Sequence, residues 1–447
     1  MSHQGMMCSD LESYKQALSR IRKELSLNTE FLDLDLTSTA KQIFNVVELN
    51  MNEAWKEYEY NLASDLVILT NNSLKSSVIS KWIIQESHNN QRRPIQLSLA
   101  KKSFIYKPRN LASDIAWNEF INWLGIELGH QISSVYKIIN KSKYGWCEFV
   151  SHNSCNSKSD ILDYYRNLGI LIAIIWVIGG RDACGANIVA CGKFPTIIDA
   201  EMILSPSNSI YSDNIFNEFK EGGLVPKRNV SINGNILSFG AAHITEALCI
   251  HEDSFHTNQI CNKPITSKRC MSCKNIPHFN DKGFSVNGHE IYLIEGYKIG
   301  INLLLNVKNK ILYRTSPFEL FQFAHGRVTL RPSVAYSAIK KIFINDLIFN
   351  NIQTDIREVL KNLPYNAHAS KYYENSILFA ESNEIIQLDI PRFSLSFKSN
   401  RLLLDNNKIL CKYQFSAFDR AIKRIKGLTK KTSINAVLQF EKYLASY

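Results

Sequence analysis

One stretch of the chain, residues 160–201, constrains the fold more than any other. It begins with a long, increasingly apolar segment that predicts a helix over residues 160–179. Two short apolar segments, at 187–190 and 196–198, then predict a pair of strands joined by a turn. The loop between the helix and the first strand carries polar side chains. The predicted helix and strand pair therefore restrict these polar side chains to the loop between them.

Three polar residues of this stretch predict phosphoryl-transfer chemistry. Asp182 and Asn187 stand five positions apart on the loop, and Asp199 follows the second strand. Kinase-type enzymes place a catalytic-loop Asp, an Asn and a second metal-binding Asp in this order. We expect Asp182 to orient or deprotonate an attacking hydroxyl, and Asn187 and Asp199 to bind Mg²⁺ with Glu201 beside them. The alternative is a turn that holds two Asx residues, but the flanking apolar helix and strand favour catalysis.

Two basic segments fit the same chemistry. Alternating residues at 95–99 and 103–107 predict a hairpin that ends in Lys107, where a kinase needs a Lys for the nucleotide phosphates. The alternative is a surface Lys at a strand end. Arg327 and Arg331 stand four positions apart in an extended segment, so their side chains can converge on one phosphate. A structural ion pair is the alternative for these arginines.

The order of the predicted elements indicates an α+β fold with two lobes. Helical spacing dominates residues 1–90, and short strands with the candidate ATP lysine follow over 91–155. The catalytic region spans 156–330. Helical spacing returns strongly in the last third, so we expect a C-terminal helical region over 331–447.

The net charge of +11 and pI of about 9.0 predict an anionic partner, or else a solvated basic surface. The N-terminus carries no signal peptide pattern, and the longest apolar run, residues 169–180, is too short to span a bilayer. We therefore expect a cytoplasmic protein with no transmembrane segment. The ten cysteines are then expected to be reduced thiols.

Three of these cysteines, Cys261, Cys270 and Cys273, have the close spacing that zinc ligands prefer. Only one C-x-x-C pair is present, and the remaining spacings are irregular. Free thiols in a loop are therefore favoured over a zinc site.

Taken together, several segments resemble the dehydratase domain of class II lanthipeptide synthetases, the LanM type. They occur in the order of that family and cover about residues 80–400. The matching pieces are Glu86-Ser87-His88, YKPR at 106–109 with LASD at 111–114, YGWCEFV at 144–150, YYRNLGILIAI at 164–174, GGRDACGANIVACGKFPTIIDAE at 179–201, GGLVP at 222–226, GRVTLRPS at 326–333 and LDIPRF at 388–393.

The resemblance implies a bilobal, lipid-kinase-like core with added terminal helices, and a reaction in two steps. Family members phosphorylate Ser and Thr of a precursor peptide with ATP and Mg²⁺, then eliminate the phosphate to leave dehydroalanine or dehydrobutyrine. Lys107 and Arg109 are then expected at the ATP phosphates, with Glu86 at an active-site position that the family writes as Asp. Arg327 and Ser333 match the Arg and Thr that the family uses for elimination.

The resemblance also implies partners. The substrate is expected to be a precursor peptide with an acidic leader, which fits the positive charge of the chain, and no nucleic-acid partner is expected. None of the zinc-binding Cys and His motifs of a cyclase domain occurs in the sequence. We therefore expect a stand-alone dehydratase that relies on another protein for ring closure.

Three positions of the catalytic loop depart from the family. Cys184 stands at a catalytic position that is usually His, Ala186 at one that is usually Glu, and Arg181 at one that is usually Thr. A thiol donates a proton and a hydrogen bond less well than an imidazole, so proton handling is expected to differ. Two alternatives therefore stay open: a kinase that stops at the phosphate, and a weak pseudo-enzyme that serves as a binding partner.

Overall fold

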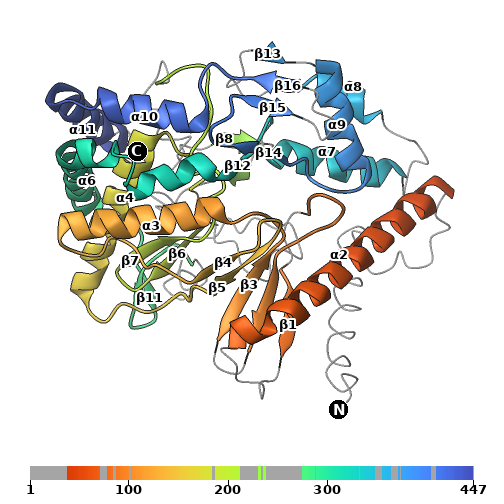
Figure 1. Cartoon of the computed structure of the whole chain (residues 1–447), viewed down its shortest axis with the longest axis horizontal. Helices are drawn as coiled ribbons and strands as arrows, with labels where there is room; N and C mark the ends of the chain where they lie inside the picture. The colour runs from red at the N-terminus through yellow and green to blue at the C-terminus, as the bar shows by residue number, and fades with distance from the viewer. Residues whose placement is uncertain are drawn as a thin grey trace.

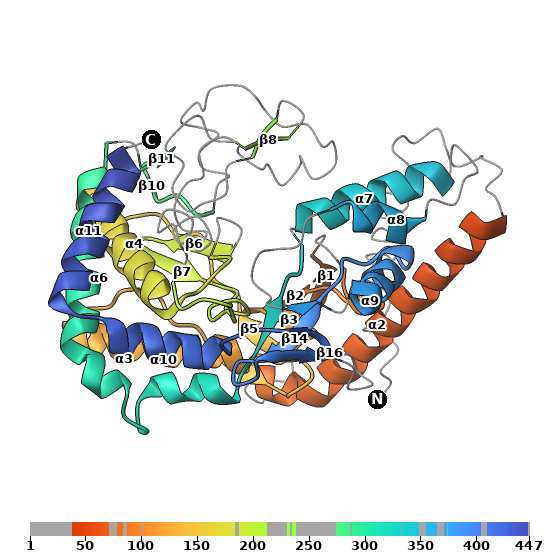
Figure 2. The ribbon, with the colours of Figure 1, turned by 90° about the horizontal axis from the view of Figure 1, so that it is seen from above.

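The computed structural model describes fourteen ranges of the chain: 38–70, 78–83, 87–99, 102–183, 187–211, 230–232, 235–237, 274–286, 288–331, 333–347, 355–363, 371–372, 374–403 and 409–445. Figures 1 and 2 show two groups of helices with strands between them. Helix and strand are mixed along the chain, as the sequence predicts.

The N-terminal strands form one antiparallel sheet in the order β1-β2-β3-β5-β4. These strands are β1 (Ile79–Trp82), β2 (Ile95–Ser98), β3 (Ser103–Lys107), β4 (Ile138–Asn140) and β5 (Gly145–Glu148). The pairing of β2 with β3 confirms the predicted hairpin. Strand β1 corrects the prediction that residues up to 90 are helical, because four residues that pair with β2 are too few to show an alternating pattern.

Helix α2 (Ser38–Thr70) connects two hydrophobic clusters. Its C-terminal half packs Trp55 and Tyr58 against the sheet residues Tyr106 and Trp146. Its N-terminal half packs Val47 and other apolar residues against α7 (Ser333–Asn345), α8 (Ile356–Lys361) and α9 (Glu374–Ile386). Both halves bury apolar area, so α2 ties the sheet to those helices.

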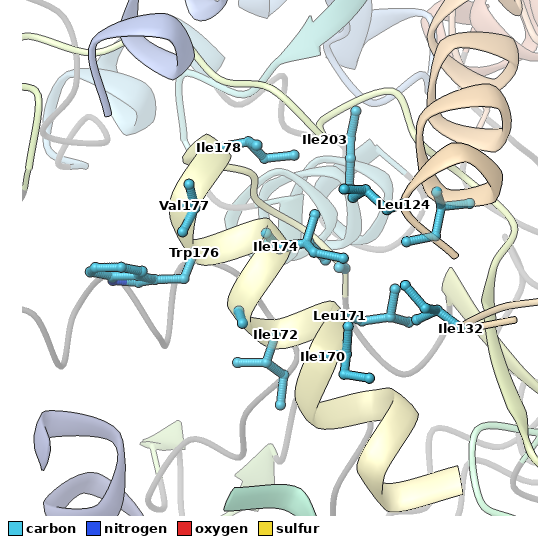
Figure 3. Packing of buried hydrophobic residues seen from close by; sticks show 14 of the residues in the cluster. Leu124, Ile132, Ile170, Leu171, Ile172, Ile174, Trp176, Val177, Ile178 and Ile203 are labelled. Atoms are coloured by element: carbon cyan, nitrogen blue, oxygen red, sulfur yellow. The ribbon is translucent and has the colours of Figure 1, made fainter. Parts of the chain in front are cut away.

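The largest core surrounds α4 (Lys158–Ile178), the helix that precedes the catalytic loop. The other helices of this core are α3 (Ala112–Leu128), α6 (Glu290–Ile311), the 3₁₀-helix η6 (Pro317–Phe323), α10 (Ala417–Gly427) and α11 (Lys430–Ala445). Side chains spread around α4, with Trp176 and Leu171 on opposite sides in Figure 3. A Cβ at Gly169 would lie 2.1 Å from the carbonyl oxygen of Leu293 on α6, so only glycine permits this helix crossing.

Helix α4 is long and apolar enough to cross a membrane, but 83% of its most apolar window is buried inside the protein. A core helix of a globular protein has the same character. Its C-terminal carbonyls are bound by two buried arginines of α10. Arg424 Nε donates to Val177 O (3.0 Å), and Arg420 Nη1 donates to Gly179 O (3.0 Å). These bonds satisfy carbonyls that a helix end leaves without partners, and they fix the point where the catalytic loop begins.

A hairpin follows the catalytic loop, as predicted, and is formed by β6 (Ile188–Cys191) and β7 (Phe194–Ile197). Two further two-stranded sheets are short. They pair β8 (Val230–Ile232) with β9 (Asn235–Leu237), and β10 (His278–Phe279) with β11 (Lys282–Gly283).

The last third combines helices with strands, which corrects the prediction of a helical region over 331–447. The helices are α7 (Ser333–Asn345), α8 (Ile356–Lys361) and α9 (Glu374–Ile386). Strand β12 (His325–Val328) pairs with β14 (Phe393–Ser396), and β16 (Ile409–Lys412) pairs with β13 (Lys371–Tyr372) and β15 (Arg401–Leu403). These strands are two to four residues long and pair with distant segments, so periodicity does not reveal them.

Candidate functional site

The register of the β6–β7 hairpin brings two predicted site residues to one end. Ile188 pairs with Ile197, so Asn187 precedes the hairpin where Asp199 leaves it. The backbone N–H of Ile198 donates to Asn187 O at 2.9 Å. Antiparallel pairing therefore converts a separation of twelve positions into spatial proximity.

Asp182 has a left-handed backbone, with φ of 57°. This conformation costs a residue with a Cβ about 1–2 kcal/mol. The Asn187 amide supports it, because Nδ2 donates to Asp182 O at 2.7 Å and lies 3.4 Å from Asp182 Oδ2. An unfavourable backbone held by a neighbouring side chain is common where a residue is positioned for function.

Lys107 and Arg109 approach Asp199 from the end of β3. Lys107 Nζ lies 3.8 Å from Asp199 Oδ1 and donates to Ile198 O at 2.6 Å. Arg109 Nη2 lies 2.5 Å from the same Asp199 oxygen. The structure thus places the predicted ATP lysine beside the predicted metal ligand, although 91 positions separate Lys107 from Ile198.

Asp114, on the first turn of α3, is a further site residue, and the sequence marks it only as part of the LASD segment at 111–114. Its carboxylate is fully buried and contacts Lys107 Nζ at 3.3 Å and Arg109 Nη1 at 2.7 Å. Burial opposes ionisation, but attraction to Arg109 and Lys107 outweighs it and lowers the pKa of Asp114. The available signal was an Asp seven positions after the candidate lysine. Asp114 holds both cations in place.

The pKa values of the two cations confirm that the ion pairs are tight. Burial alone would lower the pKa of Lys107, but Asp114 and Asp199 raise it above its ordinary value. The same two carboxylates, joined by Glu201, overcome burial and raise the pKa of Arg109. Both side chains therefore stay positively charged and suit anionic phosphate oxygens.

Glu201 is surrounded by three arginines. Its carboxylate lies 2.7 Å from Arg392 Nη2, 3.4 Å from Arg109 Nε and 3.5 Å from Arg327 Nη1. Burial opposes ionisation here, but Arg392, Arg109 and Arg327 together hold the pKa of Glu201 well below its usual range. The sequence did not identify Arg392 as a site residue. It marked Arg392 only as part of LDIPRF, one of the segments that resemble the LanM family. We call these four residues together with Lys107, Asp114 and Asp199 the ion-pair cluster, namely Lys107, Arg109, Asp114, Asp199, Glu201, Arg327 and Arg392.

Backbone contacts fix the cluster as firmly as the ion pairs. The N–H of Arg327 donates to Glu201 O at 2.8 Å, and the N–H of Arg181 donates to Met202 O at 2.9 Å. A Cβ at Gly326 would lie 2.5 Å from Glu201 O, so the close approach of β12 requires glycine there. The catalytic loop and β12 are therefore both bound to the segment after Asp199.

His88 lies beside the arginines on a tight turn. Its Nδ1 is 2.7 Å from Ile390 O, so Nδ1 carries the proton and donates. Burial and then the charge of Arg327 lower the pKa of His88 to about 3, which keeps the ring neutral at pH 7. Three left-handed residues, Asn89, Asn90 and Gln91, shape this turn. Buried Asp389 stabilises it by accepting from Gln91 N at 3.0 Å and from Gln91 Nε2 at 2.9 Å.

Arg331 does not converge with Arg327, so that prediction is wrong. Strand β12 ends at Val328, and the alternation on which the prediction depended ends with it. Arg331 is fully buried and donates through Nε to Glu381 Oε1 at 3.0 Å. Tyr336 OH donates to the same oxygen at 2.5 Å. The alternative of a structural ion pair holds for Arg331.

Several predictions lie outside the described residues. They are Glu86, Cys184 and the candidate zinc ligands Cys261, Cys270 and Cys273. Ser333 is the first residue of α7, five positions beyond the end of β12, and its side chain is also outside the description. The cysteines that are described, Cys147, Cys155, Cys191 and Cys411, are free thiols.

The donor set fits Mg²⁺ with a nucleotide better than a metal held by protein alone. Within the described ranges no group of three His, Cys, Asp or Glu side chains is placed to hold a metal. Mg²⁺ in phosphoryl-transfer sites needs only one or two carboxylates, because phosphate oxygens and water complete its shell. Among described contacts the Asp199 carboxylate uses Oδ1, and the Asn187 amide donates through Nδ2. Oxygens of both residues therefore suit a metal, while Glu201 is engaged by arginines.

A surface cavity lies elsewhere. It measures about 740 Å³ and is lined by Glu119 of α3 and by residues in and just before η6, among them Arg314, Glu319 and Phe323. It shares no residue with the ion-pair cluster. The candidate site is therefore identified by its charges and hydrogen bonds rather than by cavity size.

Comparison with known proteins identifies the family of the chain. A family model described as "Domain of unknown function (DUF4135)" matches residues 42–396, which is more than half of the chain. The chain belongs to the DUF4135 family. The DUF4135 match includes the whole ion-pair cluster, from Lys107 to Arg392.

One curated relative is similar over much of the chain. It is "Lacticin 481/lactococcin biosynthesis protein LcnDR2" of Lactococcus lactis subsp. lactis, which is 21% identical over 396 residues. The alignment covers 82% of the DUF4135 chain but only 41% of the length of that relative. The resemblance to the dehydratase region of LanM-type synthetases is therefore confirmed.

Proposed function

We propose that this protein phosphorylates Ser and Thr residues of a precursor peptide with ATP and then eliminates the phosphate, as a step of lanthipeptide biosynthesis. One observation carries the proposal: Lys107, at the end of β3, and Asp199, two positions after β7, lie 3.8 Å apart beside the Asp182–Asn187 loop. A basic side chain next to a carboxylate ligand is what a metal-bound nucleotide phosphate requires. The DUF4135 match and the similarity to LcnDR2, a lacticin 481/lactococcin biosynthesis protein, support it.

In the phosphorylation step, Lys107 and Arg109 bind the phosphate oxygens of ATP. Both are held by Asp114, so they are oriented before the substrate arrives. Asp182 accepts the proton of the peptide hydroxyl or orients that hydroxyl toward the phosphorus. Asn187 and Asp199 hold Mg²⁺, which neutralises charge on the transferred phosphate.

In the elimination step, a base removes the Cα proton of the phosphorylated residue. The electron pair forms the Cα=Cβ bond, and the Cβ–O bond breaks as the phosphate leaves with its electrons. Arg327 binds the leaving phosphate. Neutral His88, with the proton on Nδ1 and a lone pair on Nε2, offers a hydrogen-bond acceptor near Arg327.

The proposed partner is a peptide whose acidic leader is attracted to the positive charge of +11. We further propose a lipid-kinase-like fold, which follows from the LanM resemblance, and a cytoplasmic location.

A mass measurement tests the proposal. The protein is incubated with ATP, Mg²⁺ and a synthetic peptide from a short Cys-, Ser- and Thr-rich reading frame beside its gene. A gain of about 80 Da per site indicates phosphorylation, and a net loss of about 18 Da indicates dehydration. Asp199→Asn should abolish both changes. Asp163→Asn is the matched control, since the Asp163 side chain on α4 is 42% exposed and pairs with its near neighbour Arg166.

The two alternatives correspond to different outcomes. Phosphopeptide that accumulates in the wild type without dehydration indicates a kinase that stops at the phosphate. A peptide that binds but keeps its mass contradicts the proposal and favours the pseudo-enzyme, for which Cys184 and Ala186 are the motive.

A further inference from the structure

The second side of the ion-pair cluster joins Arg327 and Arg392 to one carboxylate. Among the described residues, four cations share three carboxylates in the cluster. Asp114 and Asp199 engage Lys107 and Arg109 closely. Arg327 and Arg392 instead contact the third carboxylate, Glu201, which Arg109 also approaches.

These two arginines reach Glu201 from paired backbone segments. Arg327 lies on β12 opposite Ser394 of β14, and Arg392 immediately precedes β14. Their side chains are 11% and 13% exposed, and that of Glu201 is 12% exposed. The guanidinium groups are thus largely removed from water and converge on a single carboxylate, which carries one negative charge.

We propose that Arg392 is a second phosphate-binding arginine, which acts with Arg327 on the phosphorylated peptide. The inference rests on the proposed function and extends it to a residue outside the predicted set. A phosphate dianion carries twice the charge of Glu201 and has three acceptor oxygens, so it can replace this carboxylate between the two guanidinium groups. When the Cβ–O bond breaks, Arg392 balances the charge that develops on the departing oxygen.

The geometry gives Arg392 the stronger contact of the pair. Its Nη2 lies 2.7 Å from Glu201 Oε2, whereas Arg327 Nη1 lies 3.5 Å from Oε1. Arg392 is therefore already oriented toward the point where an anion sits. A charge-assisted hydrogen bond of this kind is worth a factor of about ten or more in affinity.

Binding of inorganic phosphate tests the site without peptide or ATP. Phosphate should raise the melting temperature of the wild type, and Arg392→Gln should weaken its affinity about tenfold or more. Arg401→Gln is the matched control, because Arg401 is an exposed arginine on β15 of the same lobe and should leave the affinity unchanged. Arg392→Lys keeps the charge beside Glu201 if the Gln variant fails to fold, and should bind phosphate more weakly than wild type. Unchanged affinity in either folded variant overturns the proposal, as does a wild type that phosphate does not stabilise.

Mass measurement with ATP, Mg²⁺ and peptide provides the second readout. Arg392→Gln should still phosphorylate the peptide but accumulate the species that is heavier by about 80 Da. Dehydration at the wild-type rate would refute the role in elimination. If phosphate binding depends on Arg392 and yet the wild type never modifies the peptide, the anion site stands and the proposed function fails.

Discussion

Asp114 gives the sharpest test of how the site is held together. The substitution Asp114→Asn keeps the shape of the side chain and removes its charge. The fully buried Asp114 carboxylate lies 2.7 Å from Arg109 and 3.3 Å from Lys107, and the variant loses both ion pairs. At an effective dielectric constant of about 20, each pair at such a distance is worth about 5 kcal/mol before desolvation is subtracted.

Desolvation offsets much of this attraction, and Asp199 still faces both cations in the variant. Removal of one partner from a buried ion pair typically costs about 3–5 kcal/mol, because the remaining charge is buried without full compensation. We therefore expect Asp114→Asn to lower the free energy of unfolding by about 3–5 kcal/mol. The folded fraction should also bind ATP more weakly, since Lys107 loses its support.

Urea denaturation measures the first effect, and nucleotide titration of the folded protein measures the second. Glu148→Gln is the control, because its contact with Lys102 is long, at 3.7 Å, and largely exposed. That variant should change stability by less than about 0.5 kcal/mol. A loss below about 1 kcal/mol in Asp114→Asn would show that this carboxylate does not hold the cations, and the reasoning would fail.

Three further predictions follow from single contacts. Gly169→Ala should lower the free energy of unfolding by about 2–3 kcal/mol or prevent folding, because its Cβ would meet Leu293 O. A wild-type denaturation midpoint in this variant would contradict the close crossing of α4 and α6. Arg331→Ala should cost about 3–5 kcal/mol in urea denaturation, while the folded fraction keeps its phosphate affinity; weakened phosphate binding would restore the prediction that the structure overturned. Between about pH 6.5 and 3, His88 binds a proton in the unfolded chain but not in the folded protein. The free energy of unfolding should therefore fall as the pH drops, by up to about 1.4 kcal/mol per pH unit. His88→Gln should remove this part of the slope, and an identical pH profile of unfolding in both proteins would show that His88 is not buried as described.

The local pattern predicts much of the site. Helix 160–179 and the hairpin after it are evident because each is several residues long, periodic and bounded by turns. The hairpin register then brings Asn187 toward Asp199, and both residues occur within one short segment. Lys107 is also predictable, because a strand pair ends in it.

The remaining parts depend on contacts between distant segments. Asp114, Arg392 and His88 occur in segments that resemble the LanM family, but each becomes a site residue only through partners elsewhere in the chain. Arg392 meets Glu201 across 191 positions. Arg327 and Arg331 illustrate the same limit, since the end of β12 after Val328 sends one to Glu201 and the other to Glu381.

The sequence by itself therefore determined which residues are candidates for the proposed chemistry: a loop Asp, an Asn, a second Asp and a strand Lys in a LanM-like order. Only the tertiary structure decided which charges face one another, and hence that Asp114 supports the cations and that Glu201 is shared by three arginines. The physical reason is the separation along the chain of the residues that interact. Helices and hairpins are set by neighbours within a few positions, whereas an ion pair is set by packing that brings separate elements together and removes water from between them.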